Sequence, residues 1–134
     1  MEIRLAVIED IEIIKKYDFH ISSIELKNSI CLNRVYIAEK NERFVGWLRY
    51  NLFWDNIPFM NMLYVLEDYR RNGIGEKLVK YWENNMRLLN YKMVMTSSAS
   101  NEYAQHFYNK LGYNTIGGFL LEDDPFEVIL SKRI

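Results

Sequence analysis

Apolar and polar residues in the first half of the chain alternate between helical and extended periods. Apolar positions from Ile8 to Tyr17 recur at helical spacing, and the next helical segment has Ser22 or Ser23 as its capping residue. Three β-rich runs follow, and the turn "KNER" predicts that the first two form a hairpin. The elements expected in this half are a strand at 2–6, helices at 8–19 and 22–32, and strands at 34–40, 43–53 and 58–66.

The second half predicts a strand–helix–strand unit, a further helix and two closing strands. Its longest helix presents an i, i+4 apolar stripe that runs from Ile74 through Leu78 and Trp82 to Met86. Gly112 is the expected C-terminal cap of the last helix. The helices are expected at 74–89 and 101–111, and the strands at 91–98, 113–121 and 126–132.

The resulting order is β-α-α-β-β-β-α-β-α-β-β. An antiparallel meander that leads into a parallel crossover predicts a mixed α/β (α+β) sheet with helices on both faces. The chain has 134 residues, of which 49% are hydrophobic, and this length fits a single domain over residues 1–134.

Composition excludes several classes of function. The net charge is −1, which provides no global attraction to nucleic acid or to anionic membranes. The single cysteine, Cys31, excludes an intrachain disulfide and a cysteine-based zinc cluster, and we expect no metal site. The N-terminal stretch has early acids and no apolar run of signal-peptide length, so a cytoplasmic protein without a membrane segment is expected.

The stretch "DYRRNGIGEKL", residues 68–78, carries the candidate chemistry. It places Gly73 and Gly75 between a predicted strand and a predicted helix. A helix N-terminus exposes unpaired N–H groups and the positive end of the helix dipole, and glycines let a loop direct further N–H groups to the same point. The segment therefore predicts a binding site for an anion such as phosphate.

The glycine pattern narrows the choice of phosphate site. The Walker pattern is absent, and Leu78 stands where the dinucleotide fingerprint needs its third glycine. An R-x-x-G-x-G pattern that begins at Arg70 remains. A glycine-rich strand–helix turn with solvated arginines is the alternative interpretation of this loop.

Two segments together resemble the Gcn5-related N-acetyltransferase (GNAT) family. They are "LYVLEDYRRNGIGEKLV" and "NEYAQHFYNKLGY", and the order of the predicted elements also fits the family. The second segment matches the family feature N-x-x-A-x-x-F-Y-x-x-x-G-aromatic at Asn101, Ala104, Phe107, Tyr108, Gly112 and Tyr113.

The resemblance implies a site for acetyl-CoA. The central parallel strands would splay apart, the pantetheine arm would pair with the backbone edge of one of them, and the pyrophosphate would lie on loop N–H groups. The cofactor-binding residues so implied are Leu63, Tyr64, Val65, Arg70, Arg71, Asn72, Gly73, Ile74, Gly75, Glu76, Asn101, Ala104 and Tyr108. Asn101 has a second interpretation, since its side chain is also suited to cap the following helix.

The resemblance also implies catalytic roles. The backbone N–H of Val65 or its neighbour would polarise the thioester carbonyl, and Tyr108 would protonate the departing sulfur, because a phenol with a pKa of about 10 holds its proton at pH 7. The strand position that carries a glutamate in some members falls on Phe59, with Asn61 next on the same face, so Asn61 would position a water. Other candidate bases are Asp55, Glu67, Glu122, Asp123, Asp124, His20 and His106.

The first hypothesis is an acetyl-CoA-dependent N-acetyltransferase that acetylates a primary amine of a small molecule or peptide by direct attack in a ternary complex. The alternatives are a non-catalytic acyl-CoA-binding sensor or regulatory module, and a phosphate-binding protein for another nucleotide. A monomer and a homodimer are both compatible with the sequence. The aromatic residues that would line an acceptor cleft, or else belong to the core, are Trp47, Phe53, Trp54 and Phe59.

Overall fold

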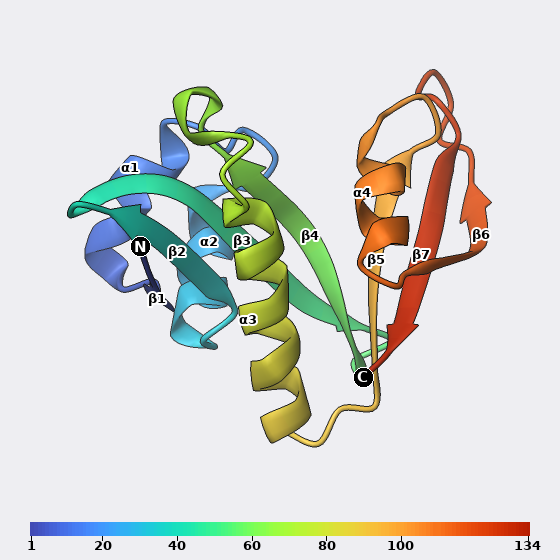
Figure 1. Cartoon of the computed structure of the whole chain (residues 1–134), viewed down its shortest axis with the longest axis horizontal. Coiled ribbons are helices and arrows are strands. Elements are labelled where there is room, and N and C mark those ends of the chain that lie inside the picture. The colour runs from blue at the N-terminus through green and yellow to red at the C-terminus, as the bar shows by residue number, and fades with distance from the viewer. The chain divides into compact units, whose positions relative to one another are not determined.

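The computed structural model describes all 134 residues (Figure 1). Its elements follow the predicted order, with two short 3₁₀ helices (η) in addition. They are β1 (Glu2–Leu5), η1 (Ile8–Asp10), α1 (Ile11–Lys15), α2 (Ser23–Cys31), β2 (Val35–Lys40), β3 (Arg43–Phe53), β4 (Ile57–Val65), η2 (Glu67–Tyr69), α3 (Ile74–Leu88), β5 (Met93–Ala99), α4 (Ala104–Lys110), β6 (Asn114–Phe119) and β7 (Glu127–Arg133).

The sheet has seven strands in the order β1-β2-β3-β4-β5-β7-β6. Strands β1 to β3 pair antiparallel, β4 pairs parallel with β5, and β7 pairs antiparallel with both β5 and β6. The predicted mixed α/β sheet is therefore confirmed. No helix combines the length and the apolar composition needed to cross a bilayer.

The chain divides into two compact units, each built from two segments of sequence. One unit contains Met1–Asn51 and Met62–Trp82, and the other contains Leu52–Asn61 and Glu83–Ile134. The boundary within β4 lies between Asn61 and Met62, directly after the register with β5, which pairs Phe59 with Met95 and Met60 with Thr96.

The core of the first unit follows from strand alternation. Along β2, Val35 and Ile37 pack with Ile14 of α1 and Leu26 of α2, all at most 1% exposed. The intervening Tyr36 turns to the other face, where its ring meets Tyr81 of α3 at 5.7 Å between centroids. Helices therefore cover both faces of this part of the sheet, as Figure 1 shows.

The hairpin and the helix caps agree with the sequence. Asn41 and Glu42 form the β2–β3 turn with φ of 53° and 63°, the left-handed pair of a tight hairpin. Ser22 caps α2 by accepting a hydrogen bond from the N–H of Glu25 at 3.2 Å. Gly112, at φ 97°, ends α4 as predicted.

Two predicted helices are shorter than expected. The segment 8–19 becomes η1 followed by α1, which ends at Lys15 because the chain leaves the helix to bury the carboxylate of Asp18. The helix expected at 101–111 begins at Ala104, because the N–H of Ser100 still bonds the carbonyl of Phe126 at 2.7 Å and continues the strand ladder. The strand expected at 113–121 likewise ends at Phe119.

Candidate functional site

The end of β4 directs backbone groups to two edges. The N–H of Leu66, just after the strand, donates to the carbonyl of Val45 in β3 at 2.8 Å. Because successive strand residues direct their N–H and C=O groups to alternate edges, Leu63 and Val65 direct theirs away from β3. Both residues lie beyond Met60, the last residue of β4 in the register with β5. Their backbone groups therefore lie on the edge where the sequence predicts the pantetheine arm.

Gly46 of β3 allows a close approach to this part of β4. A Cβ atom built on Gly46 would lie 2.7 Å from the carbonyl oxygen of Tyr64 and 3.3 Å from the Cα of Val65. The register of β2 with β3 shifts here, from Ala38 opposite Gly46 to Glu39 opposite Phe44. This β-bulge and the missing side chain together set the position of the β4 backbone.

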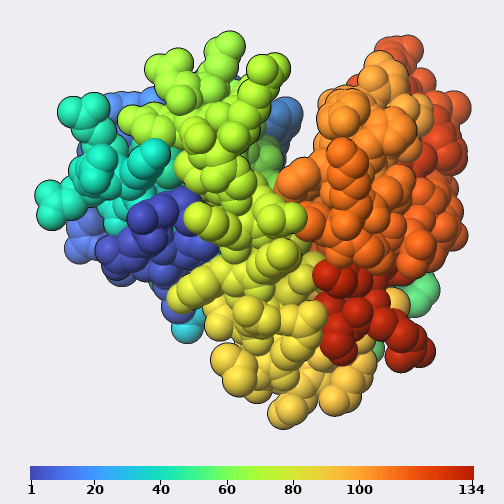
Figure 2. Space-filling model, viewed as in Figure 1, coloured from blue at the N-terminus to red at the C-terminus, as the bar shows by residue number.

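The predicted anion loop joins η2 to α3 and lies at the molecular surface (Figure 2, yellow-green). Gly73 has a φ of 76°, and its carbonyl accepts the first helical hydrogen bond, from Lys77, at 3.0 Å. No heavy atom lies within 4 Å of the position that a Cβ of Gly73 would take. The loop therefore ends in a helix start whose first N–H groups lack intrahelical partners, as phosphate binding requires.

Side chains brace this loop internally. The side-chain amide of Asn72 donates to the carbonyls of Tyr69 and Arg70 at 3.2 and 3.3 Å. The Nε of Arg70 donates to the carbonyl of Val65 at 2.8 Å, and its guanidinium lies 4.9 Å from the ring centroid of Tyr64. Arg70 thus fastens the loop to the end of β4 in addition to placing positive charge there. Arg71 is exposed and holds a φ of 66°.

Tyr108 lies in the middle of α4, which packs on β5, and its side chain is 7% exposed. The side chain of Thr96 on β5 acts to lower the pKa of its phenol. The hydroxyl of Thr96 in turn donates to the carbonyl oxygen of Met60 at 3.0 Å. Met60 and Thr96 are register partners.

Burial changes the acidity of this phenol. Desolvation, together with the negative charge of Glu102, raises the pKa of Tyr108 to about 12, although the side chain of Thr96 acts to lower it. The phenol remains protonated at pH 7, as the sequence interpretation requires, but it is a weaker acid than an exposed tyrosine.

The other predicted site residues have mixed outcomes. Asn101 is exposed in the turn before α4, whose N-cap is Tyr103 without a side-chain cap bond, so the capping interpretation of Asn101 is wrong. Ala104 is the first residue of α4 and is partly buried. Asn61 is exposed on β4, and His106 is exposed with its ring 5.3 Å from that of Tyr103.

The aromatic residues considered for an acceptor cleft differ in how far they are buried. Trp47 is 1% exposed and belongs to the core of its unit, so it does not line a cleft. Trp54 is 80% exposed beside Phe53, whose ring also lies 6.0 Å from that of Phe59.

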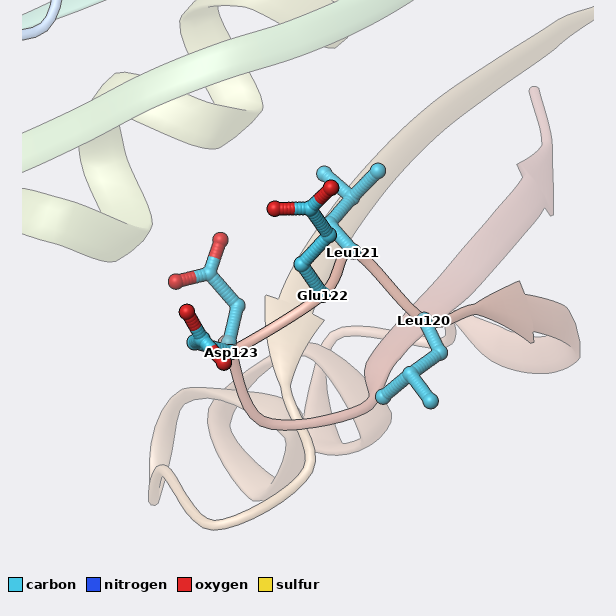
Figure 3. Close-up of a pocket in the computed structure, with 5 residues that line it drawn as sticks. Leu120, Leu121, Glu122 and Asp123 are labelled. Atoms are coloured by element: carbon cyan, nitrogen blue, oxygen red, sulfur yellow. The ribbon is translucent and has the colours of Figure 1, made fainter.

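The three acids of the β6–β7 loop, together with two leucines, line a surface pocket of about 470 Å³. Figure 3 shows that Leu121 and Glu122 project to one side of the loop and Leu120 to the other. The pocket is lined by Leu120, Leu121, Glu122, Asp123 and Asp124.

Two buried charge clusters were not predicted. Asp18, fully buried, accepts hydrogen bonds from the Nε of Arg49 at 2.8 Å and the indole of Trp47 at 3.1 Å. Burial alone would raise the pKa of Asp18, but the hydrogen bond and charge of Arg49, with the N–H groups of His20 and Trp47, lower it overall.

The second buried cluster is centred on Glu83 of α3, which is 2% exposed. It accepts from the hydroxyl of Tyr113 at 2.7 Å and from the Nζ of Lys132 at 3.0 Å. Burial raises the pKa of Tyr113, and the adjacent Glu83 carboxylate raises it further. The partners lie 30 and 49 residues from Glu83 in sequence, so no local pattern could have revealed them.

A comparison with protein families supplies the deciding observation. The model of the acetyltransferase (GNAT) family matches residues 5–113, which include the glycine loop, Thr96 and Tyr108. The chain belongs to the GNAT acetyltransferase family. None of the curated proteins compared with it matches.

Solved structures share the GNAT fold over nearly the whole chain. Ard1 from Thermoplasma volcanium is 17% identical, with a TM-score of 0.85, over 99% of this chain and 97% of that chain. PaiA N-acetyltransferase from Thermoplasma acidophilum, solved with coenzyme A, is 18% identical, with a TM-score of 0.82, over 99% and 98%. The ribosomal-protein-S18-alanine N-acetyltransferase from Escherichia coli is 16% identical, with a TM-score of 0.82, over 99% and 93%. At these identities the likeness establishes the fold.

Proposed function

We propose that this GNAT protein is an acetyl-CoA-dependent N-acetyltransferase that acts on a primary amine by direct attack in a ternary complex. The observation that carries the proposal is the family match over residues 5–113, because it includes both the glycine loop and Tyr108. We take residues 1–134 as one acetyltransferase domain.

The residues present fit the coenzyme. The N–H groups of residues 71–76 bind the pyrophosphate, and the left-handed φ of Gly73 leaves open space where a side chain would stand. The backbone of Leu63 and Val65 pairs with the amide groups of the pantetheine arm, as in the addition of a strand to a sheet edge. The set of coenzyme-binding residues is completed by Tyr64, Arg70, Asn101, Ala104 and Tyr108.

When bound, acetyl-CoA supplies an activated acetyl group. An N–C bond to the acceptor forms as the C–S bond of the thioester breaks. The amine loses one proton in this reaction, and the sulfur gains one. The N–H of Val65 donates to the carbonyl oxygen, where negative charge develops. Tyr108 holds a proton at its phenol oxygen for the sulfur. Asn61 positions a water that takes the proton of the amine.

The acceptor is a primary amine of a peptide, a protein or a small molecule. Relatives of the same fold include an enzyme named for the alanine of ribosomal protein S18 and one named PaiA N-acetyltransferase. A panel of acceptors should therefore contain peptides with different N-terminal residues, one of them alanine, together with small amines.

The test is release of the free thiol from acetyl-CoA in the presence of each amine. We expect amine-dependent release by the wild-type chain and about 10²-fold slower release by Tyr108→Phe at saturating coenzyme and pH 7, the usual scale for one general acid. Coenzyme affinity should be unchanged, because the phenylalanine ring keeps the packing.

Tight coenzyme binding without thiol release for any amine would favour the non-catalytic acyl-CoA-binding module. A Tyr108→Phe rate within about twofold of wild type would show that Tyr108 only packs.

A further inference from the structure

The proposed proton donor, Tyr108, lies on a helix that needs support from the rest of the fold. Helix α4 has seven residues, and isolated helices of fewer than about 12 residues are only marginally stable in water. The position of α4, and with it that of the phenol of Tyr108, therefore depends on tertiary contacts. At the N-terminal end of α4 the side chain of Gln105 donates to the carbonyl of Ser100 at 2.7 Å, but this contact is exposed.

The C-terminal end of α4 is bonded directly to the backbone of Tyr108. The carbonyl of Tyr108 accepts hydrogen bonds from the N–H groups of Leu111 and Tyr113, both at 3.0 Å. The N–H of Gly112 donates to the carbonyl of Asn109 at 3.1 Å. With Gly112 in the left-handed region, these bonds form a Schellman motif. The motif fixes the backbone of Tyr113 against that of Tyr108, and the centroids of their rings lie 5.7 Å apart.

The side chain of Tyr113 is anchored outside α4. Tyr113 is 1% exposed, and its hydroxyl donates to Oε2 of Glu83 at 2.7 Å. The other carboxylate oxygen, Oε1, accepts from the Nζ of Lys132 at 3.0 Å. Because burial and the adjacent carboxylate both raise the pKa of Tyr113, its hydroxyl keeps its hydrogen and remains a donor. A charge-assisted hydrogen bond in the interior, where such bonds are strong, thus holds the end of α4.

We propose that Tyr113 is a positioning residue for the proton donor Tyr108 and that Glu83 holds Tyr113 in place. The phenol must come within hydrogen-bond distance of the coenzyme sulfur, and a displacement of about 1 Å can cost a large part of the rate. The bond between Tyr113 and Glu83 prevents the short helix from shifting on the sheet, so the phenol keeps one position. This inference rests on the proposed acetyl transfer.

The first test breaks this bond in one variant and keeps it in another. Tyr113→Phe retains the ring and removes the hydroxyl that donates to Glu83. Glu83→Gln retains an oxygen that accepts from Tyr113 and removes the charge that pairs with Lys132. Both changes should lower Tm, but only Tyr113→Phe should lower kcat at saturating substrates, by about fivefold or more, with KM for acetyl-CoA within about twofold. In Glu83→Gln, kcat should stay within about twofold of wild type.

Tyr91→Phe is the matched control. Tyr91 is partly buried in the segment between α3 and β5, so this change removes one phenol hydroxyl and leaves the end of α4 intact. Its kcat should equal that of the wild type, with all rates measured well below the lowest Tm. An equal fall of kcat in Tyr113→Phe and Glu83→Gln would show that activity follows stability, and it would overturn the proposal. A kcat of Tyr113→Phe equal to wild type would overturn it as well.

A double variant shows whether Tyr113 acts through the phenol. In a Tyr108→Phe background, Tyr113→Phe should cost no further activity, within about twofold. A role in packing alone would lower kcat by the same factor in both backgrounds, and that result would contradict the proposal.

The last test needs no activity. Hydrogen exchange followed by NMR reports on the amides of residues 111 to 113, whose N–H groups form the end of the helix. In the coenzyme-free protein, Tyr113→Phe should speed their exchange about 10-fold or more relative to the amides of β5, whereas Glu83→Gln and Tyr91→Phe should leave this ratio within about threefold. If no amine supports thiol release, the proposed function fails, and exchange alone decides whether the hydroxyl of Tyr113 holds the end of α4: an unchanged ratio in Tyr113→Phe refutes it.

Discussion

Gly46→Ala tests whether the close approach of β3 to β4 sets the coenzyme edge. The added methyl carbon would lie 2.7 Å from the carbonyl oxygen of Tyr64, whereas ordinary van der Waals contact begins at 3.4 Å, so the two atoms must separate by about 0.7 Å. The second contact, 3.3 Å to the Cα of Val65, is also backbone, and the third, to Leu78, is ordinary at 3.6 Å. No flexible side chain can absorb the strain, so the β4 backbone must move.

Two opposing terms set the size of the effect. Overpacking of this kind costs about 1–3 kcal/mol. Replacing glycine by alanine increases the free energy of unfolding by about 0.4–1 kcal/mol, because the unfolded chain loses conformational freedom. We therefore expect a net loss of about 1–2 kcal/mol in the free energy of unfolding, or a Tm lower by roughly 3–10 °C for a chain of this length. Because Tyr64 and Val65 belong to the predicted coenzyme edge, acetyl-CoA affinity should fall about 10-fold.

Gly117→Ala is the matched control. No heavy atom lies within 4 Å of the position that a Cβ of Gly117 would take, so only the unfolded-state term applies, and Tm should stay level or rise. Thermal melting and calorimetric titration with acetyl-CoA on both variants decide the matter. A Tm and an affinity of Gly46→Ala equal to those of Gly117→Ala would refute the close approach and its role at the edge.

Four further predictions concern the loop and the buried charges. Gly73→Val should abolish acetyl-CoA binding in calorimetry while circular dichroism stays unchanged, and wild-type affinity would refute the phosphate-loop assignment. Arg70→Ala should weaken binding about 10-fold at low salt, less than Gly73→Val because backbone donors remain, and a neutral result would show that Arg70 contributes nothing to coenzyme binding. Glu83→Ala should lower the free energy of unfolding by about 3–5 kcal/mol in denaturant titration, because it leaves the charge of Lys132 unpaired, and a loss below about 1 kcal/mol would contradict this. Asp18→Asn should lower the free energy of unfolding by a similar amount at pH 7. The folded-state pKa of Asp18 lies below its ordinary 3.8, so the wild type keeps the stability contributed by this carboxylate above pH 3.8 and loses it as the pH falls through the folded-state pKa. Asp18→Asn should not show this loss.

The parts of the fold that depend on local residue type were predictable. The turn at Asn41 and Glu42, the cap at Ser22 and the left-handed Gly112 follow from backbone preferences of single residues. The stripe of α3 is confirmed from Ile74, 4% exposed, to Met86, 0% exposed, because helical spacing alone decides which face is buried.

The errors arose where distant groups compete with local preference. The helix from residue 8 was expected to continue to residue 19, but Asp18 leaves it to meet Arg49, 31 residues away. Asn101 is a good capping residue in isolation, yet the pairing of Ser100 with Phe126 keeps the strand going, and Tyr103 becomes the N-cap. In both cases a tertiary hydrogen bond outweighs a local preference that is typically about 1 kcal/mol.

The same distinction separates the two halves of the candidate chemistry. The proposed coenzyme binding uses backbone N–H groups, and glycines indicate such positions directly in the sequence. The acidity of Tyr108 depends instead on its surroundings: the sequence gives a pKa of about 10, and burial raises it to about 12. The difference of two pKa values corresponds to about 2.7 kcal/mol of additional cost for moving the proton to sulfur. The role of Tyr108 can therefore be proposed from a motif, but the cost of releasing the proton of its phenol depends chiefly on burial, which no motif includes.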